Sequence, residues 1–210
     1  EGSAKTLYCT NPSCQAKQIK SFTLFVSRDA MNVEGLSEAT LEKFIGRGFI
    51  QTYDDLFHLD RHREEIQEME GFGEKSYQNL MESVERARET TLPRLLYSLG
   101  IPGIGVANAR VICQETKASA EALPDLTEEE LSAVPGVGGV IAKAYVDYFE
   151  DETHRQVYRE LLREVHIEQE TADEGGRTLE GTPFVITGSV AHFANRSELN
   201  SLIESKGGKA

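Results

Sequence analysis

Apolar residues recur at helical spacing along most of this chain. Between residues 74 and 88 they fall at Tyr77, Leu80, Met81 and Val84, the pattern of a helix with one buried face. Similar patterns predict further helices over residues 92–99, 106–116, 139–149 and 153–165. The hydrophobic pattern therefore indicates a mainly α-helical fold.

Several helix boundaries can be predicted from the residues that precede the apolar runs. Ser37 is expected to cap a helix that ends at Gly46 or Gly48, and Thr127 with Glu130 forms a capping box. Two short helices are predicted over 54–59 and 60–69, with Asp60 as the N-cap of the second. The apolar run 21–26 fits either a strand or a helix, because periodicity does not separate the two in so short a segment.

The outward and inward faces of the helix over 153–165 are predicted from the same pattern. Its arginines are expected to face solvent and its aliphatic residues to face the core. The arginines are Arg155, Arg159 and Arg163, and the aliphatic residues are Val157, Leu161 and Leu162.

A short phrase of the form apolar, any, Gly, apolar, small occurs four times, each time before a predicted helix. We call the copies hairpin 1 (33–37), hairpin 2 (69–73), hairpin 3 (101–105) and hairpin 4 (134–138). Their leading glycines are Gly35, Gly71, Gly103 and Gly136, which lie 36, 32 and 33 residues apart. A near-constant spacing of this kind marks an internal repeat.

The repeated phrase has a physical use. Glycine permits positive φ and close backbone approach, and the free N–H groups of the first helical turn then point outward together. Such donors at the positive end of a helix dipole suit a phosphate. A single copy would be read as a plain helix connection, but four copies with the same chemistry favour contacts to several phosphates of a nucleic acid.

Composition limits how such binding would work. The net charge of −13 argues against a broad electrostatic grip on a nucleic acid, so local donors must hold the phosphates. The five histidines are scattered, and no nucleophile or metalloprotease motif occurs. No apolar run is long enough to span a membrane, and residues 1–3 have no signal-peptide character, so we expect a cytoplasmic protein.

The two ends of the chain differ from its helical centre. Cys9 and Cys14 flank a turn, and half of a structural zinc site and a coincidental pair of cysteines are equally compatible with them. Residues 164–180 carry six acids against one arginine, as expected of a solvated linker. A strand over 183–188 and a helix over 195–206 then read as the opening βα unit of a second domain.

Longer stretches of the chain resemble a known family. The hairpins resemble those of helix-hairpin-helix DNA-binding motifs, and the whole chain is similar to the C-terminal part of bacterial NAD-dependent DNA ligases. The stretches that carry the resemblance are 9–17 (CTNPSCQAK), 25–31 (FVSRDAM), 73–80 (GEKSYQNL), 95–101 (LLYSLGI), and 184–188 (FVITG) with 207–210 (GGKA), which resemble the start of a BRCT domain.

The resemblance implies a domain order. It consists of a partial zinc-finger segment (1–29), a four-copy helix-hairpin-helix DNA-binding domain (30–165), an acidic linker (166–178) and a truncated BRCT-like α/β domain (179–210). Cys9 and Cys14 resemble two of the four zinc ligands of the family.

The resemblance also implies DNA contacts, largely through hairpin backbone amides. The residues that match the family's DNA-binding positions, or lie where they add positive charge, are Gly35, Gly71, Gly73, Lys75, Gly103, Ile104, Gly105, Arg110, Gly136, Val137, Gly138 and Lys143. Ser37 replaces the second glycine of hairpin 1, while Glu34 and Glu70 place a negative charge in hairpins 1 and 2. Hairpins 3 and 4 are therefore predicted to be the better phosphate sites.

The family seals nicks in double-stranded DNA during replication and repair, with NAD as the source of AMP and with Mg²⁺ present. The family's Lys-x-Asp-Gly motif, whose lysine takes the AMP, does not occur in this sequence. We therefore expect a monomeric piece that clamps nicked duplex DNA, works with the remainder of a ligase chain and with other repair or replication proteins, and has no catalytic residues of its own. The alternative is a non-catalytic repair scaffold that recruits protein partners.

Overall fold

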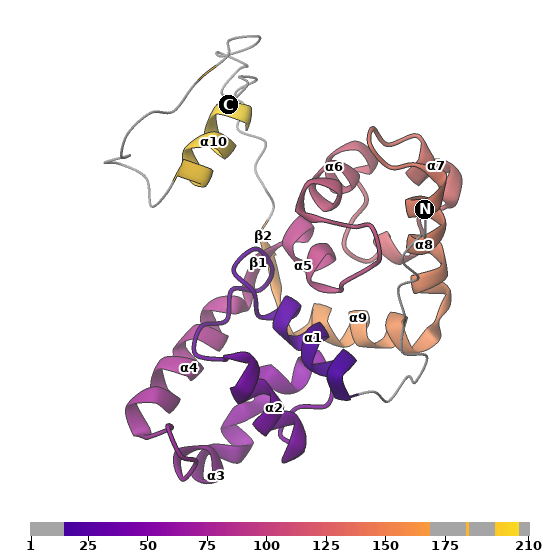
Figure 1. The fold of residues 1–210 in the computed structure, drawn as a ribbon. Helices are drawn as coiled ribbons and strands as arrows, with labels where there is room; N and C mark the ends of the chain where they lie inside the picture. Colours follow the sequence, from indigo (N-terminus) through magenta and orange to yellow (C-terminus); the bar gives the residue numbers. More distant parts are fainter. Residues whose placement is uncertain (1–14, 169–183, 185–195, 206–210) are drawn as a thin grey trace, which may run out of the picture. The chain divides into compact units, whose positions relative to one another are not determined.

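The computed structural model describes residues 15–168, 184 and 196–205. The chain divides into two compact units, Glu1–Glu168 and Gln169–Ala210, and each is considered by itself (Figure 1). The predicted zinc-finger cysteines, and the predicted strand over 183–188 apart from residue 184, lie outside the described residues. In the second unit the structure describes α10 (Arg196–Ser205), which confirms the helix predicted there.

The first unit is mainly helical, as predicted. Its first part contains hairpins 1 and 2 and consists of α1 (Gln15–Phe25), α2 (Glu38–Gly46), the 3₁₀ segment η1 (Tyr53–His62), α3 (Arg63–Gln67) and α4 (Glu74–Ala87). Its second part contains hairpins 3 and 4 and consists of β1 (Glu89–Thr91), α5 (Leu92–Ser98), α6 (Val106–Thr116), η2 (Leu123–Asp125), α7 (Glu128–Ser132), α8 (Gly139–Glu150), α9 (Glu152–Glu164) and β2 (His166–Glu168).

The two predicted helix caps are confirmed. The Ser37 hydroxyl accepts a hydrogen bond from the Thr40 amide at the start of α2. At α7 the Thr127 hydroxyl accepts from the Glu130 amide, and the Glu130 carboxylate accepts from the Thr127 amide. Local side-chain chemistry therefore sets these two helix starts.

The prediction of Asp60 as an N-cap was wrong. The 3₁₀ segment η1 runs on to His62, and His62 is the N-cap of α3. The segment begins at Tyr53, where the Asp55 carboxylate accepts hydrogen bonds from the amides of Gln51 and Thr52. Because η1 continues past the predicted end at residue 59, Asp60 lies inside it.

One hydrophobic core extends through the first unit, from Phe22 in α1 to Val165 after α9. Its aromatic centre in the second part includes Tyr145, Phe149 and Tyr158, whose rings contact one another in sequence. The hydroxyl of Tyr158 donates to the carbonyl of Ala120. The hydrophobic pattern did not single out Tyr158, yet this residue is fully buried on α9.

Helix α9 joins the two parts of the unit. It packs against α8 and against η1, and Figure 1 shows it running back from α8 to the strand pair. Strand β2 pairs in parallel with β1, with His166 opposite Glu89. The unit therefore extends to Glu168, three residues past the predicted domain boundary at 165.

The prediction that Arg155 faces solvent was wrong. Its guanidinium donates to the carbonyls of Phe149 and Pro124 and forms an ion pair with Asp125. These bonds cover the end of α8 and the η2 turn. The helical pattern cannot reveal them because the acceptors come from other parts of the chain.

Candidate nucleic-acid interface

The four hairpins share one backbone conformation at their leading glycine. The φ angles are +89° at Gly35, +85° at Gly71, +80° at Gly103 and +82° at Gly136. This is the left-handed region, which side chains other than that of glycine adopt only with strain. The sequence repeat is therefore also a repeat of backbone geometry.

Hairpins 3 and 4 are tight turns closed by an internal hydrogen bond. The Ile104 amide donates to the carbonyl of Ile101, and the Val137 amide donates to the carbonyl of Val134, both at 3.0 Å. Proline before a positive-φ glycine is the signature of a type II turn, in which proline supplies the second residue. The side chains of Ile104 and Val137 are buried and anchor the turns, and their amides are already bonded within the protein.

The second glycine of hairpins 2, 3 and 4 has a different role from the first. Gly73, Gly105 and Gly138 are the N-caps of α4, α6 and α8, and all three have extended backbone without positive φ. A Cβ added at any of them would meet nothing within 4 Å. Neither backbone conformation nor packing inside this chain requires glycine there.

The missing side chains leave the ends of these helices open. None of the three N-cap residues forms a side-chain capping bond, so the first-turn amides have no side-chain cap. All three glycines are exposed. The space in front of each helix is thus free for a group that approaches the backbone closely.

Hairpin 1 differs because it is closed by contacts within the protein. Its Glu34 amide donates to the Ser83 hydroxyl at 2.7 Å, and a Cβ at Gly35 would lie 3.8 Å from Leu80 of α4. Ser37 supplies the cap that the glycines of the other hairpins lack. Hairpin 1 therefore packs onto α4.

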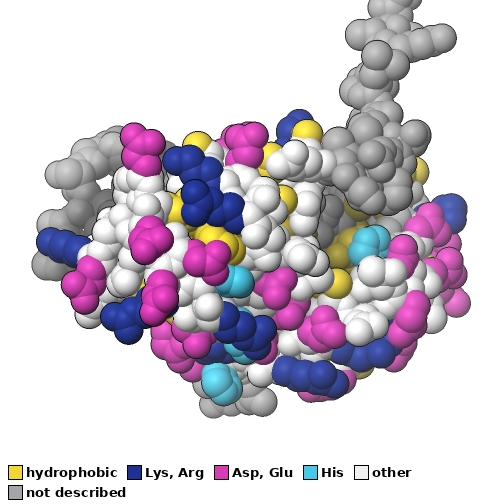
Figure 2. Space-filling model, turned by 90° about the horizontal axis from the view of Figure 1, so that it is seen from below, with side chains coloured by type: hydrophobic (Ala, Val, Ile, Leu, Met, Phe, Trp, Pro, Cys, Tyr) yellow, Lys and Arg dark blue, Asp and Glu magenta, His cyan; other side chains and the backbone are white. Residues whose placement is uncertain are grey.

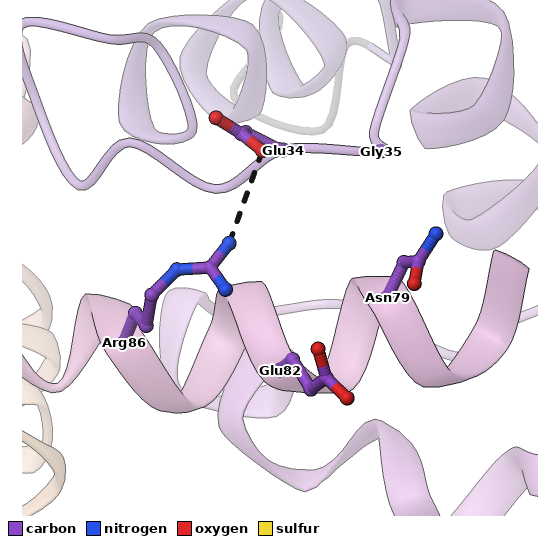
Figure 3. A pocket seen from close by; sticks show the side chains of 5 residues that line it. All are labelled: Glu34, Gly35, Asn79, Glu82 and Arg86. Carbon is purple, nitrogen blue, oxygen red and sulfur yellow. Dashed lines mark ion pairs between the residues drawn. The ribbon is translucent and has the colours of Figure 1, made fainter.

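A polar pocket of about 380 Å³ opens beside hairpin 1 (Figure 3). It is lined by Glu34, Gly35, Asn79, Glu82 and Arg86. Glu34 and Arg86 face each other across it at 3.8 Å. The two carboxylates in this pocket disfavour a phosphate at that place.

Hairpins 3 and 4 lie against each other's helices. A Cβ at Gly103 would come within 3.0 Å of Ile141 on α8, and the nearest side chain to a Cβ at Gly136 would be that of Asn108 on α6. The side-chain amide of Asn108 also donates a hydrogen bond to the Gly103 carbonyl at 2.8 Å. The two hairpins therefore form one paired unit, with α6 and α8 starting from it.

Charge is arranged differently around the four helix starts. The first turns of α2 and α4 carry Glu38 and Glu74, whereas the first turns of α6 and α8 contain no acid. A helix start usually gains from a nearby negative charge. The beginnings of α6 and α8 lack this compensation, so an external anion would supply it.

The predicted basic residues differ in whether an acidic side chain compensates their charge. Lys75 and Arg110 are exposed, and neither forms an ion pair within residues 15–168. Lys143 bonds to Asp147 at 2.8 Å, and this bond raises the pKa of the lysine above its ordinary value while compensating its charge. Figure 2 shows acidic and basic side chains interspersed on one face of the molecule.

Two partners of the candidate site were missed by the sequence reasoning. The pairing of Lys143 with Asp147 follows a spacing of four on a helix and was open to prediction. The contact of Asn108 with hairpin 3 had no sequence signal.

Among the described residues, no group of three or more His, Cys, Asp or Glu side chains is arranged to hold a metal ion, and no helix is long and apolar enough to cross a membrane.

Comparisons with known proteins agree with this geometry. Residues 27–86 match a family described as a SAM-like helix-hairpin-helix tandem, and residues 94–158 match a helix-hairpin-helix motif. These two matches correspond to the parts with hairpins 1 and 2 and with hairpins 3 and 4. The match confirms the predicted helix-hairpin-helix array.

The chain is also similar over its length to proteins named DNA ligase. It is 51% identical over 209 residues to one from Lachnoclostridium phytofermentans and 48% identical over 209 residues to one from Ruminiclostridium cellulolyticum, each match covering 100% of this chain and 32% of the relative. A DNA ligase from Thermosipho africanus is 35% identical over 202 residues, which cover 96% of this chain and 30% of the relative. The chain spans about a third of the length of these curated relatives.

Proposed function

We propose that this chain, which matches about a third of the length of proteins named DNA ligase and carries tandem helix-hairpin-helix motifs, is the DNA-holding part of an NAD-dependent DNA ligase. Its role is to clamp nicked duplex DNA while the strands are joined. The observation that carries the proposal is the open space at Gly73, Gly105 and Gly138. A glycine that the fold itself does not require is explained by a ligand that must reach the backbone.

The clamp acts through the first turns of α4, α6 and α8. Their outward amides donate hydrogen bonds to phosphate oxygens, and the helix dipole adds to the attraction. Arg110, the fifth residue of α6, supplies a positive charge beside this site. Contacts to phosphate carry no base information, so the clamp holds DNA of any sequence.

Hairpins 3 and 4 are the stronger half of the clamp. They are paired, have no acid in their turns and start helices without an acidic first turn. Hairpin 1 supports the fold through Ser83 and Leu80, and hairpin 2 contributes Gly73 and Lys75. This order follows from which amides are accessible and which charges surround them.

The chemistry of ligation belongs to the rest of such a ligase in this proposal. NAD supplies the adenylyl group and Mg²⁺ assists phosphoryl transfer in the complete reaction. The Lys-x-Asp-Gly motif that accepts AMP is absent from this sequence. Cys9 and Cys14 are proposed as part of a zinc site, and both lie outside the residues that the structure describes.

The test uses the full chain and a fluorescently labelled nicked duplex, with binding followed by anisotropy at several salt concentrations. Gly105→Leu and Gly138→Leu are the informative variants, because a Cβ at either position meets nothing within 4 Å and the backbone needs no positive φ. We expect each variant to bind about tenfold or more weakly, since one phosphate contact with several amides is blocked.

The matched control is Gly46→Leu. Gly46 also has open space and no positive φ, but it ends α2 rather than preceding a helix. This variant should bind DNA as the parent does. If the parent fails to bind duplex DNA even at low salt, or if all three variants bind equally, the proposed clamp is wrong.

A further inference from the structure

Two large apolar side chains are exposed in the described part of the first unit. Val140 has 87% of its surface exposed and Val106 has 39%. The other large apolar residues between 15 and 168 are buried or half-buried, including the neighbouring Ile104 and Val137. The two exposed valines thus stand out among the described residues of the unit.

Both valines lie at the paired hairpins. Val106 is the first residue of α6, directly after the open N-cap Gly105. Val140 is the second residue of α8, two positions after the open N-cap Gly138. A Cβ at Gly103 would contact Ile141 of α8, and the side chain nearest a Cβ at Gly136 belongs to α6, so the two valines lie at the starts of the two helices that begin from the paired hairpins.

The corresponding positions in the other two repeats are different. The first two helical residues are Glu38 and Ala39 in α2, and Glu74 and Lys75 in α4. A polar or acidic residue is favourable at an exposed helix start, and an exposed β-branched apolar residue gains nothing there. Within the described residues nearly all of Val140 and over a third of Val106 stay uncovered, so a contact outside the chain is needed to bury this apolar surface.

The position of the valines identifies that contact. The amides of the same helical turns hold phosphate oxygens in the proposed function, on which this inference rests. Each phosphate in a DNA strand is flanked by two deoxyribose sugars, whose carbon-bound hydrogens form an apolar surface. We infer that Val106 and Val140 pack against deoxyribose sugars next to the phosphates held by α6 and α8.

This contact gives the clamp a means of distinguishing DNA from RNA. The ribose 2′-hydroxyl is a polar group that needs a hydrogen-bond partner. A valine pressed against it would remove water without offering a partner, which is unfavourable. Phosphate contacts alone do not make this distinction, so the valines are specificity-determining residues.

The test compares Val106→Ser and Val140→Ser with the parent, using duplex DNA and an RNA duplex of the same sequence. Each variant should bind DNA about threefold to fivefold more weakly, as expected when the partial burial of one valine side chain on binding is lost. The slope of affinity against salt should stay unchanged, because no charge is removed. The preference for DNA over RNA should fall in both variants.

Two controls accompany these variants. Ala39→Ser changes the second residue of α2, where hairpin 1 is closed by internal contacts, and should leave binding unchanged. Val140→Ile keeps the apolar contact and should retain both affinity and preference. Circular dichroism of each variant should match that of the parent, since the replaced side chains are exposed.

The outcomes separate this inference from the proposed function. If the serine variants bind DNA as tightly as the parent while Gly105→Leu and Gly138→Leu lose binding, the sugar contact is wrong and the clamp stands. If serine weakens binding to DNA and RNA equally, the sugar contact is also wrong. If the parent does not bind duplex DNA, both proposals fail.

Discussion

The Arg88 guanidinium donates to the Glu164 carboxylate at 2.8 Å, across 76 residues of sequence. The same arginine also donates to the carbonyls of Glu164 and Phe57, and it lies over the Phe57 ring. His58 bonds to the other carboxylate oxygen of Glu164. This cluster ties the end of α9 to η1 and α4, and so holds the part with hairpins 3 and 4 against the part with hairpins 1 and 2.

Removing the Glu164 carboxylate should destabilise the first unit. In Glu164→Ala, Arg88 loses the one hydrogen bond that it donates to the carboxylate, and His58 loses its carboxylate partner. Because both Arg88 and Glu164 keep about a fifth of their surface in solvent, we expect the free energy of unfolding to fall by about 1–2 kcal/mol. Urea unfolding measures this change.

The comparison for that experiment is Asp147→Asn. Its pair with Lys143 is exposed and lies within one helix, so the urea midpoint should not change measurably. If the two variants unfold at the same urea concentration, the cluster does not hold the two parts together.

The stability of the unit should depend on pH through Glu164. Burial by itself raises the pKa of its carboxyl, but hydrogen bonds from Arg88 and His58 outweigh burial and hold the pKa below its ordinary value. The unfolded chain takes up the proton at about pH 4.3, so the contribution is complete above that pH and is lost as the pH falls further, through the folded pKa. Urea midpoints measured between about pH 6 and pH 3 should fall less steeply in Glu164→Gln than in the parent.

The leading and second glycines of the hairpins should respond differently to alanine. Gly71→Ala introduces only the strain of positive φ, at a cost of about 1 kcal/mol. Gly103→Ala should cost more, because the new Cβ would also lie 3.0 Å from Ile141. Gly73→Ala and Gly105→Ala should cost less than either, since neither needs positive φ and both have room, which leaves only the N-cap preference for glycine over alanine. Thermal melts of the four variants would establish this order, and equal melting temperatures would contradict it.

Charge variants at the paired hairpins should change DNA affinity in opposite directions. Arg110→Gln removes an uncompensated cation, so DNA affinity should fall. The slope of log affinity against log salt concentration should become less steep by about one. Asp147→Asn releases Lys143 from its partner, so affinity should rise. Lys143→Gln should have a smaller effect than Arg110→Gln, because Asp147 already compensates this lysine. Anisotropy titrations over a salt series measure all three, and an unchanged affinity in Asp147→Asn would show that Lys143 does not approach DNA.

The candidate site was predictable where it depended on local chemistry. The repeated phrase was expected to contain glycines because they permit positive φ, and the Ser37 cap was expected from its place before a helix. The sequence did not distinguish the two glycines within a hairpin. Only the tertiary structure decides that the first has the strained φ and that the second has open space in front of it.

The sequence by itself determined the helices, the four turns and the acidic charge, because helical periodicity, capping and glycine conformation depend on residues within a few positions of one another. The tertiary structure decided that hairpins 3 and 4 pair, that Arg155 bonds to the carbonyls of Phe149 and Pro124, that β2 joins β1, and that Arg88 meets Glu164. These contacts join segments far apart in the chain, and their partners are selected by how the helices pack. The same packing leaves the amides and valines at α6 and α8 open while it closes hairpin 1 against α4.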